Sequence, residues 1–188
     1  MQSSTHFVIG ASLCRYTRWR PLGLALALVS HLALDALPHF EDPSILPRWL
    51  ADRVGPVWGF VLGLDQLLVA GLVLVTWLHF SPPERGNRSF AAYLIAGGLL
   101  ACMLDYLSTL MGRGSAAALL NGWPHVWWFV PYLHAVRRQV EWRPAIAAAC
   151  LLLESSVFIT GLWLLFRGAR RPGCGGQVLD GGADTTTP

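Results

Sequence analysis

The chain has 188 residues, of which 54% are hydrophobic and only 13% are charged, and its mean hydropathy is +0.46. A typical soluble domain carries about 25% charged residues, so this composition excludes an ordinary soluble domain and a disordered chain. The net charge of +3 comes from dispersed arginines, and this pattern argues against nucleic-acid binding. Long apolar runs with few charges are typical of an integral membrane protein.

The first 37 residues contain two apolar segments separated by a basic turn. Thr5–Tyr16 predicts a half-length helix, and Arg18-Trp19-Arg20-Pro21 predicts a turn before the next helix. That helix is expected over residues 22–37, as the first and shortest of four transmembrane helices. It contains a histidine and an aspartate, which the core of a cleaved signal peptide normally lacks, so we expect it to be retained.

Three longer apolar segments follow, over residues 57–80, 90–111 and 145–166. Each reaches the ~20 residues needed to cross a hydrocarbon core of about 30 Å. Between the last two, Ala116–Val136 contains three tryptophans and two prolines. This composition favours an interfacial or re-entrant segment over a fifth span. Residues 167–188 are rich in glycine and threonine and predict a disordered tail.

The predicted fold is therefore all-α, with one domain over residues 1–166. We expect an integral membrane bundle of about four transmembrane helices, with a short N-terminal helix and the interfacial aromatic segment. Eight of the 14 arginines would fall on the side of the membrane where Arg20 lies. The positive-inside rule therefore slightly favours a cytoplasmic location for that side. Gly55, Gly59 and Gly63 form a stripe of small residues that predicts close packing against a neighbouring helix.

Each of the four predicted spans carries one acidic residue. On insertion scales, an aspartate at the centre of a transmembrane helix costs about 2.5–3.5 kcal/mol, and no lysine or arginine lies within the spans to pair with it. Counted at ~1.5 Å per residue, all four acids fall in the same half of the bilayer. They need compensation by protonation, by polar or histidine side chains, or by a bound metal ion. The four acids are Asp35, Asp65, Asp105 and Glu154.

The first span also carries histidines around its aspartate. His31, Asp35 and His39 stand at i, i+4 and i+8, a spacing that drifts by only ~80° around a helix. Two imidazoles and a carboxylate on one face can supply three ligands to a divalent metal ion. Pro38 is expected to end the helix near residue 37, which leaves His39 on the following turn.

The N-terminal helix adds a further candidate ligand. If it forms a hairpin with the first span about Trp19, His6 and His31 lie at the same height in the bundle. We therefore predict a site with Asp65 or Asp105 opposite it, and the alternative is a buried polar network that fixes the register of the helices. The predicted metal ligands are His6, His31, Asp35 and His39.

These residues also carry a family resemblance. The run from Thr5 to Ala11, followed by Ser30-His31 and by Asp35 through His39, resembles the bacterial membrane-bound metal-dependent hydrolases over about residues 5–42. Members of that family are small multispan inner-membrane proteins with an early histidine and a later His/Asp cluster. The resemblance implies a bacterial inner-membrane location and a metal site at the four residues predicted above.

Two functions are consistent with this sequence. The first is a membrane-embedded hydrolase in which a divalent metal ion, zinc by ligand type, activates water against a lipid or amphiphilic substrate. Asp65, Asp105 or Glu154 would act there as a further ligand or as general base. The second is a non-enzymatic membrane protein, an ion or proton carrier or an assembly subunit, with a buried His/Asp network. Membrane lipids are the expected partners in both cases, and a homo-oligomer remains open.

Overall fold

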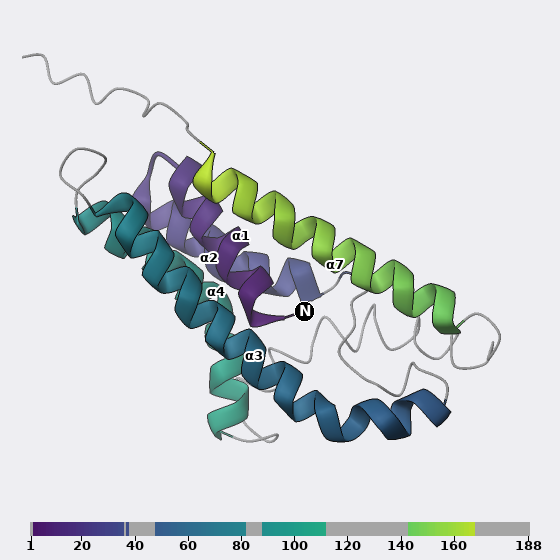
Figure 1. Cartoon of the computed structure of the whole chain (residues 1–188). Helices are drawn as coiled ribbons and strands as arrows, with labels where there is room; N and C mark the ends of the chain where they lie inside the picture. The colour runs from purple at the N-terminus through teal and green to yellow at the C-terminus, as the bar shows by residue number, and fades with distance from the viewer. Residues whose placement is uncertain (1, 36, 38–47, 82–87, 112–142, 168–188) are drawn as a thin grey trace, which may run out of the picture.

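The computed structural model describes residues 2–35, 37, 48–81, 88–111 and 143–167. This part of the chain is helical and contains no strand, which confirms the all-α prediction for it. The predicted interfacial segment and the predicted C-terminal tail lie outside these residues, except for Arg167. The helices are α1 (Ser3–Tyr16), α2 (Arg20–Asp35), α3 (Arg48–Phe80), α4 (Arg88–Met111) and α7 (Arg143–Phe166) (Figure 1).

Helices α1, α2, α4 and α7 begin and end within two residues of the predicted bounds. Helix α3 begins nine residues before the predicted start at residue 57. The prediction placed its start after Pro56, but the helix continues through that proline. A proline removes one backbone hydrogen bond, and a helix of 33 residues retains the others.

Three helices are long and apolar enough to cross a membrane, through the segments Phe60–Phe80, Arg88–Leu107 and Ala148–Phe166. Their outward side chains are apolar, with Leu67 70% exposed and Leu152 69% exposed. This surface suits contact with lipid and indicates a membrane protein. Helix α2 has 16 residues and is shorter than the ~20 residues of a full span, so the fourth span stays a prediction.

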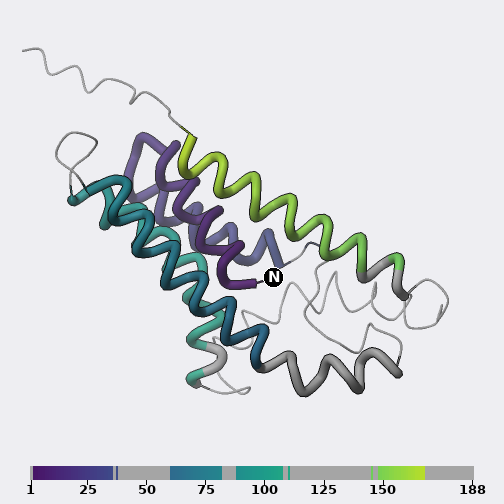
Figure 2. Tube along the Cα trace, viewed as in Figure 1, coloured from purple at the N-terminus to yellow at the C-terminus, as the bar shows by residue number. Residues whose placement is uncertain are grey.

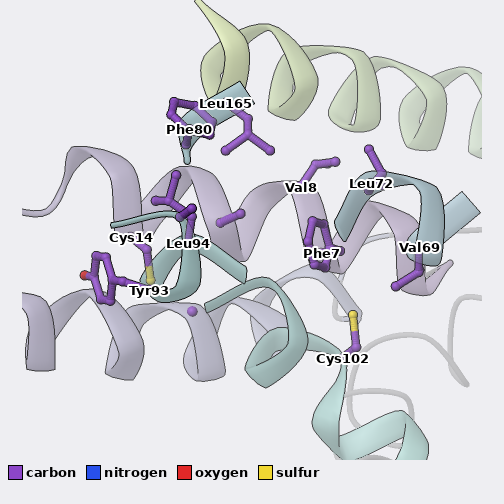
Figure 3. Packing of buried hydrophobic residues seen from close by; sticks show 13 residues of the cluster. Phe7, Val8, Cys14, Val69, Leu72, Phe80, Tyr93, Leu94, Cys102 and Leu165 are labelled. Carbon is purple, nitrogen blue, oxygen red and sulfur yellow. The ribbon is translucent and has the colours of Figure 1, made fainter. Parts of the chain in front are cut away.

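Helix α1 lies at the centre of the bundle and packs against the other four helices (Figures 1 and 2). Its start, marked N in Figure 1, lies midway along α7 rather than at an end of it. Phe7, Val8 and Ala11 have no exposed surface and belong to one buried cluster that also contains Leu94 and Leu165 (Figure 3). A half-length helix is thus stabilised by burial on all sides instead of by crossing the membrane.

Small residues let α1 and α4 approach each other closely. A Cβ atom added to Gly10 would lie 2.6 Å from the Cβ of Ala101 and 2.7 Å from the carbonyl oxygen of Gly97. The two backbones therefore touch, as in other small-residue helix contacts of membrane proteins. The predicted packing of the Gly55–Gly63 stripe is not found at Gly63, where an added Cβ would meet nothing within 4 Å.

The other end of α1 binds the end of α7. Arg15 donates hydrogen bonds to the carbonyl oxygens of Leu165 and Arg167, and the Tyr16 hydroxyl donates to that of Leu164 at 3.0 Å. These bonds satisfy carbonyl groups that have no partner within a helix end. Contacts at both ends therefore fix α1 along α7, and the two helices run in the same direction.

Candidate metal centre

The structure brings two histidines and an aspartate into contact in the middle of the bundle. The ring centroids of His6 on α1 and His31 on α2 lie 4.4 Å apart. The Asp35 carboxylate meets both rings, with Oδ1 3.0 Å from Nε2 of His6 and Oδ2 3.1 Å from Nε2 of His31. The side chains are 0–1% exposed. The α1–α2 hairpin and the i, i+4 spacing predicted from the sequence produce this arrangement.

The orientation of the His31 ring is set by a backbone contact on α4. Its Nδ1 lies 2.9 Å from the carbonyl oxygen of Ala101, and because a carbonyl only accepts, Nδ1 is the donor. In the neutral ring, Nε2 then carries a lone pair beside the Asp35 carboxylate, and two acceptors 3.1 Å apart repel unless a proton or a cation lies between them. A histidine that binds a metal ion typically donates its other ring N–H in this way.

His6 supplies a second imidazole suited to metal ligation. Among the residues that the structure describes, neither of its ring nitrogens makes a hydrogen bond of normal geometry, although Nε2 is close to Asp35. Buried polar atoms are nearly always hydrogen-bonded or bound to a water or an ion. The fully buried His6 ring, with no hydrogen bond of normal geometry to a described residue, is therefore better explained as a ligand of a cation near the Asp35 carboxylate than as a ring that serves only for packing.

Asp105 on α4 adds a fourth group to the cluster. Its Oδ1 lies 3.9 Å from Nε2 of His31, and His6, His31 and Asp105 each offer a ligand atom within 4.8 Å of the others. Ligand atoms around a tetrahedral zinc ion lie about 3.4 Å apart, given zinc bonds of ~2.0–2.2 Å. Small side-chain shifts would bring these atoms to that spacing. The Asp105 side chain is also 26% exposed, so the cluster is accessible from outside at this residue.

The other two intramembrane acids contact the backbone of α1. Asp65 accepts from the backbone N–H of Ser3 at 2.9 Å and of Ser4 at 3.2 Å, and Oε1 of Glu154 accepts from that of Gln2 at 2.6 Å. The first N–H groups of a helix have no partner within it and attract negative charge. The structure thus joins Asp105 to the histidines and places Asp65 and Glu154 on the start of α1. His39 lies outside the described residues.

The acids and histidines nevertheless share one level of the bundle, because all of them surround the first turns of α1. The prediction that the acids lie in one half of the bilayer stays a prediction. We call this group the polar layer; its members are His6, His31, Asp35, Asp65, Asp105 and Glu154.

Sequence reasoning did not identify the groups that support this layer. The Ala101 carbonyl reaches His31 because α4 packs against α2, and the Gly97-x-x-x-Ala101 spacing is a signal that predicts close approach of α4 to its neighbours. Tyr106 and Gln66 were also missed. The Tyr106 hydroxyl donates to Oε1 of Gln66 at 2.8 Å, and Nε2 of Gln66 donates to the Ser3 hydroxyl at 3.3 Å, which links α4, α3 and α1.

Comparison with known proteins adds no assignment to this geometry. No family model matches the chain, and no curated protein and no solved structure shows significant similarity to it. The resemblance of residues 5–42 to the membrane-bound metal-dependent hydrolases therefore remains a prediction from sequence, and the case for a metal centre depends on the side chains of the polar layer.

Proposed function

We propose that the protein is a membrane-embedded, metal-dependent hydrolase of the bacterial inner membrane. The observation that carries the proposal is the His31 ring, whose Nδ1–H is held by the Ala101 carbonyl while Nε2 lies 3.1 Å from the Asp35 carboxylate. In metal sites, a ligating histidine typically donates its other ring N–H to a carbonyl or carboxylate, which orients the ring. The His31 ring has this arrangement, with Nε2 directed at a buried carboxylate.

His6, His31 and Asp35 would hold the metal ion, and two imidazoles with one carboxylate favour zinc. A zinc ion bound there would lower the pKa of a water molecule to about 7 and so supply a nucleophile at neutral pH. Asp105 is the more exposed acid of the cluster. It can therefore act as a fourth ligand or accept the proton that the attacking water loses.

The position of the cluster favours a lipid or another amphiphile as substrate. It lies among helices whose outer surfaces are apolar, and Asp105, on the long apolar helix α4, is its accessible edge. A polar headgroup with an apolar tail would place its scissile bond at the polar layer and its tail along the lipid-facing side chains. An amphiphilic substrate would therefore contact both the polar layer and the apolar outer surface.

The first experiment measures metal content in the full chain purified in detergent. We expect about one zinc per chain, and we expect it to be lost in His31→Ala and in Asp35→Ala because each removes a ligand. Asp65→Asn is the matched control, since Asp65 binds the backbone of α1 and its loss leaves the ligand set complete. A wild-type protein without stoichiometric metal would overturn the proposal.

A second experiment tests hydrolysis directly. Phospholipid vesicles and long-chain p-nitrophenyl esters and phosphodiesters are offered to the purified protein. We expect turnover that a chelator abolishes, that zinc restores, and that is absent in His31→Ala. Turnover that survives both the chelator and the substitution would come from a contaminant and would count against the hydrolase.

One observation favours the alternative, a non-enzymatic protein with a buried polar network. The Asp35 oxygens lie 3.0 and 3.1 Å from the two imidazoles, which are also ordinary distances for charge-assisted hydrogen bonds. If one ring is protonated, the cluster is an ion-paired network that fixes helix register. This alternative predicts no bound metal and a native fold that a chelator leaves unchanged.

A further inference from the structure

A pocket lies on the side of α1 that faces α3 and α7, away from the two helices that complete the histidine cluster. Its volume is about 110 Å³. Its polar lining residues are Gln2, Ser4, Thr5, Glu154 and Ser155. Glu154 belongs to α7 and is 5% exposed. The pocket therefore places a buried carboxylate among hydroxyl groups within an apolar bundle.

Only one oxygen of this carboxylate has its partner within the described chain. Oε1 accepts from the backbone N–H of Gln2 at 2.6 Å, whereas Oε2 is buried and has no hydrogen bond there. Burying a charged oxygen in an apolar environment is costly unless a cation or a proton compensates for it. The neutral N–H of Gln2 does not neutralise the charge, so the pocket attracts a cation.

No described side chain of the protein supplies that cation. The sequence contains no lysine. The described arginine side chains are located at the opposite end of α1 and α7, where Arg15 binds the end of α7 and Arg167 lies over the Trp163 ring. A cation at Glu154 would therefore come from outside the described part of the chain.

The remaining lining residues of the pocket are apolar and indicate the kind of cation. We call Leu68, Leu151 and Phe158 the apolar wall, and the two leucines are 44% and 46% exposed. A hydrated inorganic ion gains nothing from such a wall. An alkylammonium ion can place its charge at the carboxylate and its carbon stem against the leucines, with the aromatic ring attracting the charge as well. At ~30 Å³ per water-sized group, the volume suits three or four heavy atoms.

We propose that this pocket binds a primary ammonium group on a short carbon stem, with Glu154 as its counter-ion and the hydroxyls as hydrogen-bond acceptors. An ethanolamine-like group has this size and chemistry. It can come from the headgroup of an aminophospholipid, through the exposed leucines, or from a soluble amine. The binding site is separate from the metal centre and does not depend on the hydrolase activity.

The test measures thermal unfolding of the full chain in a detergent that lacks amines. Ethylammonium chloride is titrated against sodium chloride at equal ionic strength. We expect a saturable rise in Tm with ethylammonium alone. Glu154→Gln keeps an acceptor for Gln2 but removes the charge, and it should weaken the apparent affinity about tenfold or more, because a hydrogen bond to a charged group contributes ~1.5–3 kcal/mol. Asp65→Asn is the matched control and should respond like the wild type.

A second variant keeps the test decisive if Glu154→Gln fails to fold. Leu151→Trp fills the apolar wall and leaves the carboxylate in place, and we expect it to lose the response as well. An equal rise with sodium chloride, a full response in either pocket variant, or no saturable rise in the wild type would each overturn the proposal. The last outcome is expected if Glu154 simply carries a proton or the pocket holds only water.

Lipid nanodiscs distinguish the two sources of the amine. Wild-type protein is placed in discs of phosphatidylcholine with or without phosphatidylethanolamine. If a headgroup is the ligand, the second lipid raises Tm and removes the response to free ethylammonium. If a soluble amine is the ligand, the response is the same in both discs. Both results support the ammonium site, and zinc content should be unchanged by Glu154→Gln in either case.

Discussion

Nδ1 of His31 donates a hydrogen bond to the backbone carbonyl oxygen of Ala101 at 2.9 Å, and this contact determines which atom of the ring faces the acids. The ring reaches this carbonyl because α2, which carries His31, packs against α4. Helix packing and the geometry of the cluster are thus coupled, because a change in the distance between α2 and α4 would release the imidazole and disturb the cluster.

Asp35 and Asp105 should differ in their effect on stability. Asp35→Ala removes a carboxylate that is 1% exposed and contacts both histidines, and removing one partner of a buried pair costs about 3–5 kcal/mol. Asp105→Ala affects a side chain that is 26% exposed, so its cost should be smaller. Equilibrium unfolding in mixed micelles compares the two variants, and equal losses would contradict a cluster that opens at Asp105.

Asp65 should act as the cap of α1. Asp65→Ala leaves the backbone N–H groups of Ser3 and Ser4 buried without their acceptor, and each unsatisfied group costs ~1–3 kcal/mol. Asp65→Asn retains one acceptor oxygen and should recover part of the loss. Unfolding free energy and amide hydrogen exchange at the start of α1 check this prediction. It would be wrong if the alanine variant kept both the stability and the protection of the wild type.

The contact between α1 and α4 should tolerate no added side chain. Gly10→Ala would place a Cβ 2.6 Å from that of Ala101, and we expect a destabilisation of ~1–3 kcal/mol from overpacking. Gly71→Ala is the matched control, because nothing lies within 4 Å of its added Cβ and alanine favours helix by up to about 1 kcal/mol. Unfolding in micelles measures both variants. Similar stabilities would show that the two helices can separate without cost.

The arginines at the two ends of the bundle predict the membrane orientation. In the described residues, five arginines lie where α1 and α7 end and α2 and α4 begin, and the three others lie at the starts of α3 and α7. By the positive-inside rule, we expect the five-arginine end to lie in the cytoplasm. The polar layer, at the opposite end of α1, then falls in the outer half of the bilayer.

Cysteine labelling in whole bacterial cells tests this orientation. In a background without the native cysteines, Trp19→Cys marks the arginine end and Leu110→Cys marks the other; both positions are well exposed. We expect a membrane-impermeant maleimide to label Leu110→Cys in intact cells and Trp19→Cys only after lysis. The reverse pattern would place the polar layer in the cytoplasmic half.

Much of the fold could be predicted from the sequence because apolar length is a local property. Runs of about 20 apolar residues gave the cores of α3, α4 and α7, and the basic turn about Trp19 gave the α1–α2 hairpin. The i, i+4 spacing of His31 and Asp35 likewise placed both side chains on one face of a helix before any packing was considered. The start of α3 was placed too late because a proline was read as a helix boundary, although a long helix can continue through one.

The partners of the intramembrane acids could not be predicted in the same way. The sequence by itself determined that Asp35, Asp65, Asp105 and Glu154 lie in apolar segments without lysine or arginine, over residues 22–37, 57–80, 90–111 and 145–166, because composition and helix rise suffice for that conclusion. Only the tertiary structure decided that Asp65 and Glu154 bind the start of α1 while Asp35 and Asp105 face the histidines. Which acids contact α1 and which contact the histidines depends on how α1 is rotated about its axis and how far it extends into the bundle. Contacts between residues 62 to 152 positions apart set both, and no local pattern encodes them.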